Sequence, residues 1–431
     1  MSLVRQLSIA ALAAPFALAA CGGDDGQPDP KVCSTNSGMG VLADFSVPCD
    51  PGGNGILFTA SGEGFAISGY DFPPGPDQEV AFVDGWELRY DRVLTTFDHI
   101  TLSQGPDKSA SDQSLCDDGS GGSVKCGTGK SVVAEVDGPF AIDLHKGGEI
   151  VNPDGDPTAA VAALTGQNKV GNAAFDPSER YAFGFEVVKA TTSAKNINLD
   201  ADDLADYQMM VAQGFTTLFV GTATWKGNND GSLTGSGCTT TDPNYDFAAI
   251  STHPVHFKLG TTAPTVYRNA QNPNNDPAAP LGDEEHQRGI HTVANDKTVA
   301  QLTFHLDHMF WESFVHDSPA HFDQFAARYA GSTTDPMAVM ADYKGYALTP
   351  FVDHQGHTLP WRNCLGDPLP ATVGMTFSTE GINVVPGGTC DASSCTIIRD
   401  FYDYTMYNHS TFGHLNADGL SFVDRQYPSP P

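Results

Sequence analysis

The sequence has few basic residues and no long apolar run, and both deficits restrict what it can be. Lysine and arginine total 22, against 52 aspartates and glutamates, so the formal net charge is -30. Such an acidic surface repels nucleic acid and anionic lipid headgroups and attracts cations. A need for solubility alone also explains the excess of acidic residues. The apolar stretch at residues 7–20 is shorter than the ~20 residues that a membrane-spanning helix needs.

Motifs of several enzyme classes are missing as well. There is no H-E-x-x-H helix, no G-x-S-x-G elbow, no phosphate-binding glycine loop and no dinucleotide fingerprint. No pair of cysteines has the C-x-x-C spacing of a zinc ribbon or a thioredoxin site. A histidine-ligated metal enzyme stays compatible with the sequence, because such ligands are often scattered along a chain.

The N-terminus predicts export. Arg5 precedes the apolar stretch, which ends in Leu18, Ala19, Ala20 and Cys21, and this ending resembles a bacterial lipobox. The resemblance implies a signal peptide at residues 1–20 and a diacylglycerol on the sulfur of Cys21, which anchors the chain to a membrane. An ordinary cleavage site with an incidental cysteine is the alternative.

Beyond Cys21, residues 21–54 predict a lipidated flexible tether. Residues 22–31 are glycine, proline and charged or polar residues with nothing to bury. Gly22 stands where a retention aspartate would lie in lipoproteins of the inner membrane. By analogy with lipoprotein sorting, we expect the outer membrane, on its periplasmic or its surface side.

The other eight cysteines indicate disulfide bonds, as an oxidising compartment outside the cytoplasm allows. Proximity in the sequence suggests three local pairs and one distant pair, but eight cysteines permit many connectivities. The pairs suggested are Cys33 with Cys49, Cys116 with Cys126, Cys390 with Cys395, and Cys238 with Cys364.

Alternating apolar and polar residues predict a mainly β protein with an antiparallel, sandwich-like architecture and a few helices in the C-terminal half. The chain is long for one core, so we expect an N-terminal β domain at residues 55–240 and a histidine-rich C-terminal β domain with helices at residues 241–431. The clearest strand patterns lie at residues 79–102, 131–136, 140–144, 181–190 and 216–225. Helices are predicted at residues 199–213, 318–329, with Ser318 as the cap, and 396–407.

Histidine is concentrated toward the C-terminus. Twelve of the 14 histidines follow residue 252, several in close pairs such as His253 and His256, or His354 and His357. Neutral imidazole is a common ligand of zinc, copper, nickel and iron. Structural or surface histidines are the alternative for each pair.

Residues 301–312 are the best candidate for a metal site. In a strand, His305 and Asp307 share one face and His308 points the other way unless a bulge turns it. In a helix, His305, His308 and Glu312 share a face. The β-branched and aromatic residues before His305 favour the strand. His414 is the first choice to complete the ligand set, followed by His316 and Asp317, and zinc or copper is the expected ion. Acidic turns that suggest calcium lack the EF-hand pattern.

Two segments resemble an uncharacterised group of exported lipoproteins of Gram-negative, often myxobacterial, bacteria. One is the β run from Gly85 to Leu94, and the other is His305 to Phe310, in which Met309 is inserted before the phenylalanine of a His-x-Asp-His-Phe pattern. The residues around Phe140 and Tyr181 are similar to periplasmic β-sandwich domains. The resemblance implies a β-sandwich and a metal site, but no reaction.

The sequence therefore predicts a cell-envelope lipoprotein that captures or delivers a transition metal, and it favours binding over catalysis without excluding an enzyme. A metal-free surface interaction or adhesion protein is the first alternative. A metal-dependent envelope enzyme is the second. Protein partners and oligomeric state do not follow from the sequence.

Overall fold

The computed structural model describes the greater part of the chain beyond residue 52. The longer described segments are 53–72, 85–104, 131–164, 174–226, 253–268, 270–274, 289–311, 320–329, 332–345 and 400–413. Shorter pieces are 32–33, 74–75, 78, 80, 82, 115–117, 123–125, 382–384, 396–398 and 422–425. The predicted signal peptide and Cys21 lie outside these residues. So do six of the other cysteines, and the disulfide bonds therefore stay predictions.

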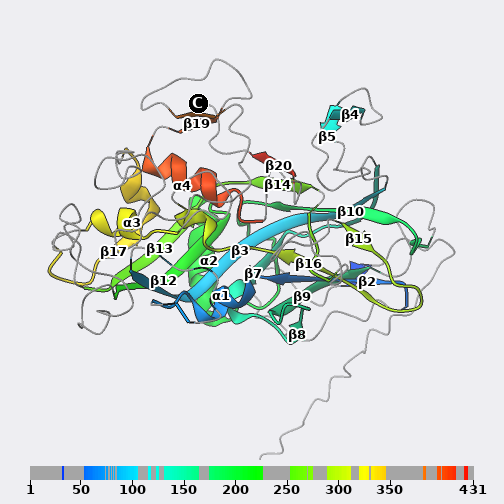
Figure 1. Cartoon of the computed structure of the whole chain (residues 1–431), viewed down its shortest axis with the longest axis horizontal. Coiled ribbons are helices and arrows are strands. Elements are labelled where there is room, and N and C mark those ends of the chain that lie inside the picture. Colours follow the sequence, from blue (N-terminus) through cyan, green and yellow to red (C-terminus); the bar gives the residue numbers. More distant parts are fainter. Residues whose placement is uncertain are drawn as a thin grey trace, which may run out of the picture.

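Most described strands belong to two large sheets (Figure 1). The five-stranded sheet has the order β1 (Val32–Cys33), β9 (Pro157–Leu164), β2 (Ile56–Ser61) and β16 (Thr298–Thr303), with β8 (Ile150–Val151) beside β9. The main path of the eleven-stranded sheet is β17 (Met337–Val339), β13 (Val255–Thr261), β12 (Thr217–Trp225), β3 (Trp86–Gln104), β10 (Arg180–Val187), β14 (Thr265–Arg268) and β20 (Phe422–Arg425).

Short strands complete this arrangement. On the larger sheet, β6 (Ser131–Val136) and β7 (Phe140–Asp143) pair with β3, β11 (Lys195–Asn196) pairs with β7, and β15 (Ile290–His291) pairs with β10. Two small pairs are separate from both sheets: β4 (Leu115–Asp117) with β5 (Ser123–Lys125), and β18 (Ile382–Val384) with β19 (Thr396–Ile398). The predicted mainly β fold is confirmed. Most neighbouring strands are antiparallel, but four pairs are parallel: β2 with β16, β13 with β17, β7 with β11, and β18 with β19.

The main core lies between the two sheets. The rings of Phe58 on β2 and Phe183 on β10 stack with their centroids 6.2 Å apart. All six residues of β2 are buried, as expected for a strand hydrogen-bonded on both edges, by β9 and β16. At the start of β3, buried and partly exposed residues alternate, so Trp86, Leu88 and Tyr90 point into this core.

Strands from distant parts of the sequence meet in both sheets. β2 pairs with β16, and β12 pairs with β13, so residues on both sides of position 240 share the same sheets. The hydrophobic core likewise contains residues from both parts, including Phe58 and Phe304.

Helices are few, as predicted. The α-helices in the described residues are α1 (Glu63–Ser68), α2 (Ala201–Gln213), α3 (Asp323–Ala327) and α4 (Phe401–His409). α2 lies within the helix predicted at residues 199–213; Asp200 caps it in a capping box with Asp203, and Gly214 ends it in a left-handed conformation. Within the described residues, no helix has the length and apolar character to cross a membrane.

Two helix predictions were wrong in their bounds. Ala320 forms β-bridges with Phe82 and Trp311, so α3 begins only at Asp323, with Phe322 as its cap. The predicted cap, Ser318, lies outside the described residues. The predicted helix at residues 396–407 begins at Phe401, capped by Asp400, because the β-branched residues before it form strand β19.

Candidate functional site

The histidine-rich segment after β16 is neither of the two structures that the sequence suggested. β16 ends at Thr303, residues 304–307 turn, and His308–Phe310 form a 3₁₀ turn, η4. Buried Phe304, Leu306 and Phe310 anchor the segment in the core. The tight turn brings His305, Asp307 and His308 together, and one possible ligand atom from each lies within 4.8 Å of the other two.

The hydrogen bonds of His308 assign its tautomer. Its Nδ1 lies 2.7 Å from the hydroxyl of Thr411, and that hydroxyl lies 2.6 Å from the carbonyl oxygen of Asn408. The single hydroxyl proton of Thr411 goes to the carbonyl, which can only accept. His308 Nδ1 must therefore carry a proton and donate it, so the lone pair is on Nε2, the nitrogen that can bind a metal.

The carboxylate of Asp307 is held by the indole of Trp311. Trp311 Nε1 donates to Asp307 Oδ2 at 2.7 Å. The Trp311 ring also lies against His308, with their centroids 3.7 Å apart. One aromatic side chain thus orients both neighbours, and at 2% exposure it shields them from water.

His305 is oriented by a carboxylate from another element. Its Nδ1 lies 3.4 Å from Glu63 Oε2, and its backbone N–H donates to the carbonyl of Phe412 at 2.7 Å. A carboxylate beside one ring nitrogen is the usual outer partner of a metal-binding histidine. Glu63 begins α1 with a φ of +58°, a conformation that costs energy in a residue other than glycine and that is concentrated at functional sites.

The end of α4 closes the site on one side. Asn408 Nδ2 donates to the backbone oxygen of Trp311, and Thr411 and Phe412 make the contacts with His308 and His305 just described.

His409 is different. It is fully buried between Phe219 and Phe412, and neither ring nitrogen has a hydrogen-bond partner in the described part of the chain. Burial lowers the pKa of His409 to about 3.

The other predicted ligands are not placed. His316, Asp317 and His414 lie outside the described residues, as do Glu312, His354 and His357. His253 and His256 lie beside Asp335, with distances of 3.2 Å and 3.7 Å to its carboxylate, and their side chains are about two-fifths exposed. Of the predicted metal ligands, His305, Asp307 and His308 are therefore the three that the described structure brings together.

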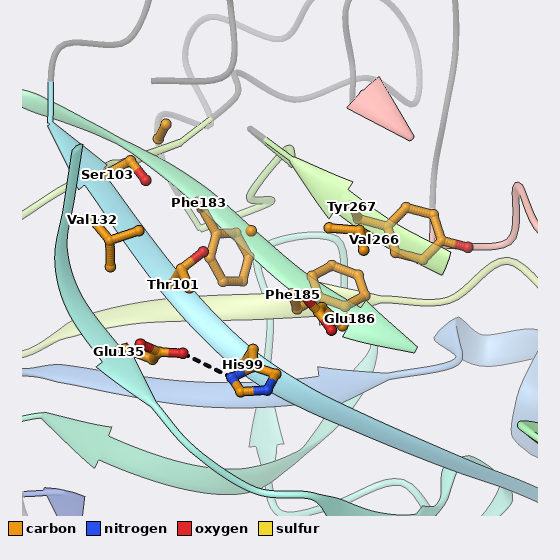
Figure 2. Close-up of a pocket in the computed structure, with 12 residues that line it drawn as sticks. His99, Thr101, Ser103, Val132, Glu135, Phe183, Phe185, Glu186, Val266 and Tyr267 are labelled. Atoms are coloured by element: carbon orange, nitrogen blue, oxygen red, sulfur yellow. Dashed lines mark hydrogen bonds and ion pairs between the residues drawn. The ribbon is translucent and has the colours of Figure 1, made fainter. Parts of the chain in front are cut away.

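A second group of possible ligands was missed from the sequence. His99 on β3 lies 2.8 Å from Glu135 on β6 and 3.4 Å from Asp137, next to a pocket of about 270 Å³ (Figure 2). Burial alone would lower the pKa of His99, but the hydrogen bond to Glu135 and the charges of Asp98 and Glu186 outweigh it and raise the pKa. The side chain of His99 is 46% exposed and that of Asp137 is 72% exposed, so this group is better explained as a surface ion-pair cluster.

The His305 group can hold a transition metal. Two imidazoles and one carboxylate suit Zn²⁺ or Cu²⁺, and the described residues supply three of the four ligands of a tetrahedral shell. His308 is buried, while the side chains of His305 and Glu63 are 13% and 28% exposed. The group therefore lies at the edge of the core, beside the partly exposed side chains of His305 and Glu63.

Buried His409 predicts a specific acid sensitivity. Its pKa is about 3 in the folded protein and ~6.5 in the unfolded chain, so protons bind preferentially to the unfolded chain below pH 6.5. At pH 5 this preference lowers the free energy of unfolding by about 2 kcal/mol relative to pH 7. His409→Leu removes this contribution, which urea unfolding of both proteins at the two pH values measures. An equal loss of stability in wild type and variant would contradict the prediction.

Comparisons with protein-family models, curated proteins and solved structures find no match to this chain. The resemblance to exported lipoproteins stays a prediction from the sequence. The function of the chain is therefore inferred from the geometry of the site.

Proposed function

We propose that this chain is a lipoprotein of the cell envelope, anchored in the outer membrane through Cys21, that captures or delivers a transition metal ion. His305, Asp307 and His308 hold the ion. The observation that carries the proposal is their convergence within 4.8 Å of one another. Zinc and copper are the candidate ions.

The partners of these side chains support the proposal. A structural histidine needs only to satisfy its own hydrogen bonds, whereas a ligand needs a lone pair aimed at the site. Thr411 keeps the proton of His308 on Nδ1, and Glu63 lies beside Nδ1 of His305. Both arrangements favour Nε2 as the metal-binding atom, and the Nε2 of His305 is buried.

The position of the site suits exchange of the ion. His308 and Trp311 are buried, but His305 and Asp307 are only partly covered. Three ligands near the surface let an ion enter and leave more easily than a closed four-ligand site. The acidic chain, with a net charge of -30, also concentrates cations around the protein.

A metal-dependent envelope enzyme is the second candidate. The specific observation in its favour is the ligand count, because catalytic zinc sites use three protein ligands and keep one position for water. Binding without catalysis is the first choice, because the nearest further carboxylate in the described part of the chain, Glu63, is engaged with His305 Nδ1.

Removal of both imidazoles tests the metal site. Wild-type protein purified without a histidine tag and freed of metal is expected to bind one equivalent of Zn²⁺ or Cu²⁺ in calorimetric titration. His305→Ala combined with His308→Ala removes two of three ligands and is expected to abolish this binding.

The matched control is His253→Ala combined with His256→Ala. These histidines have the same spacing as His305 and His308 and also lie beside an aspartate, but their side chains are about two-fifths exposed. Stoichiometric binding should survive in this control. Wild type that binds no metal, or a control that loses binding while the His305 and His308 variant keeps it, would refute the proposal.

Thr411→Val tests the tautomer of His308. Valine keeps the shape of threonine but cannot accept the Nδ1 proton, so the proton is no longer held away from Nε2. Outer partners of metal-binding histidines contribute about 10- to 100-fold to affinity, and we expect a loss in this range by competition with a chelator. Unchanged affinity in a folded Thr411→Val protein would show that His308 does not bind through Nε2.

Cys21→Ser tests the anchor. Without the thiol no diacylglycerol can be attached, and the protein is expected to move from the membrane fraction to the soluble fraction of expressing Gram-negative cells. Mass spectrometry of the N-terminal peptide should detect the lipid on the wild type alone. A wild-type protein that begins before residue 21 and carries no lipid would contradict the lipoprotein assignment.

A further inference from the structure

The pocket beside His99 is a hollow in the face of the larger sheet that points away from the core (Figure 2). Its floor is made of short side chains that pair across two neighbouring strands. Ser103 of β3 lies opposite Ala182 of β10, and Thr101 lies opposite Gly184. The aromatic residues that alternate with these on β10 point into the core instead. The hollow therefore results from four small residues in two adjacent rows of the sheet.

A β-bulge adds charged side chains beside this floor. Phe97 and Ile100 of β3 both point into the core although they are three residues apart, because β3 has one extra residue opposite residues 184–186 of β10. Asp98 and His99 therefore both lie on the outer face, and His99 has a φ of +47°. The bulge thus places an imidazole and a carboxylate beside the hollow.

Four carboxylates lie around this single imidazole. Glu135 of β6 and Glu186 of β10 line the hollow and flank His99 (Figure 2). The His99 ring also lies 3.4 Å from Asp137 and 3.8 Å from Asp98. Among the described residues that line the hollow there is no lysine or arginine. The hollow is therefore negatively charged even when the imidazole is protonated, which favours a cationic ligand over an anion.

Glu186 is available to such a ligand. It is partly buried, and its carboxylate makes no hydrogen bond or ion pair with any described residue. The same holds for the hydroxyls of Thr101 and Ser103 on the floor. A partly buried charge without a partner costs free energy, and a bound cation would offset that cost. Val132 and Val266 also line the hollow, and Val132 is 46% exposed, so apolar surface is available to an alkyl chain.

We propose that the hollow binds a small aliphatic diamine in its doubly protonated form. One ammonium group pairs with Glu186. The other lies two residues further along the strands, beside Thr101 and Glu135, which face each other across β3 and β6. Two residues of a strand span roughly 6.6 Å, which is close to the length of an extended four-carbon diamine. Each ammonium group has three donors and no acceptor, which suits carboxylates and hydroxyls.

The size of the hollow limits the length of the ligand. Its volume is about 270 Å³, just below the ~300–1,000 Å³ of ordinary small-molecule pockets, so a diamine of a few carbon atoms fits better than a larger molecule. The inference goes beyond the proposed metal site, because the hollow shares no residue with His305, Asp307 and His308.

Calorimetric titration of the metal-free full mature chain with 1,4-diaminobutane, at low ionic strength and in the presence of a chelator, tests this inference. Wild type is expected to bind one equivalent. Glu186→Gln keeps the shape of the side chain and removes its charge, so it is expected to bind the diamine about tenfold more weakly. 1,4-Butanediol has the same carbon chain without the charges and should not bind measurably.

Glu149→Gln is the matched control. Glu149 is exposed and does not line the hollow, and its loss changes the net charge by the same amount. This variant should bind the diamine as wild type does. Equimolar Mg²⁺, which carries the same charge but no alkyl chain, should not displace the diamine. Glu186→Gln should unfold at the wild-type temperature, because Glu186 has no partner among the described residues.

Each contrary result would overturn the proposal. Wild type that shows no saturable binding would refute the site, and equal binding of 1,4-butanediol would refute the role of the ammonium groups. Displacement by Mg²⁺, or an equal loss of affinity in both glutamine variants, would mean that the acidic surface attracts cations in general. A Glu186→Gln protein that unfolds at a lower temperature would show that Glu186 serves the fold instead. Binding of Zn²⁺ or Cu²⁺ should be the same in Glu186→Gln and wild type, so the metal site stands or falls separately.

Discussion

The candidate site depends on the packing of α4 against the turn that follows β16. Thr411 accepts the proton of His308, Phe412 accepts the backbone proton of His305, and Asn408 binds the backbone of Trp311. Because these groups come from one helix end, they position the whole turn together. Without them, three adjacent polar side chains in a turn would have no fixed geometry and no preferred tautomer.

Several features of the fold could be predicted from local sequence signals. The strand patterns at residues 131–136 and 216–225 predicted β6 and β12, and the helix expected at residues 199–213 contains α2. These signals act over a few residues, which is why they suffice. The start of the helix predicted at residues 396–407 shows where such signals fail. The spacing of apolar residues over the whole segment fits a helix, but the β-branched residues from Thr396 to Ile398 form a strand.

The site itself was only partly predictable. Its three ligands are close together in the chain, so their residue types and spacing alone indicated a metal site. The 3₁₀ turn that unites them was not foreseen, because strand and helix were the two periodic alternatives considered. Glu63 could not be assigned to the site, since it lies more than 200 residues before His305 and reaches it only through the pairing of β2 with β16.

Anomalous X-ray diffraction of zinc-loaded crystals, recorded on both sides of the zinc absorption edge, would decide whether the three ligands hold an ion. We expect one strong anomalous peak bonded to His305, Asp307 and His308, with metal–nitrogen distances near ~2.0–2.1 Å. A peak at His99 and Glu135 instead, or no ordered zinc at all in crystals grown with an excess of the ion, would contradict the proposed site.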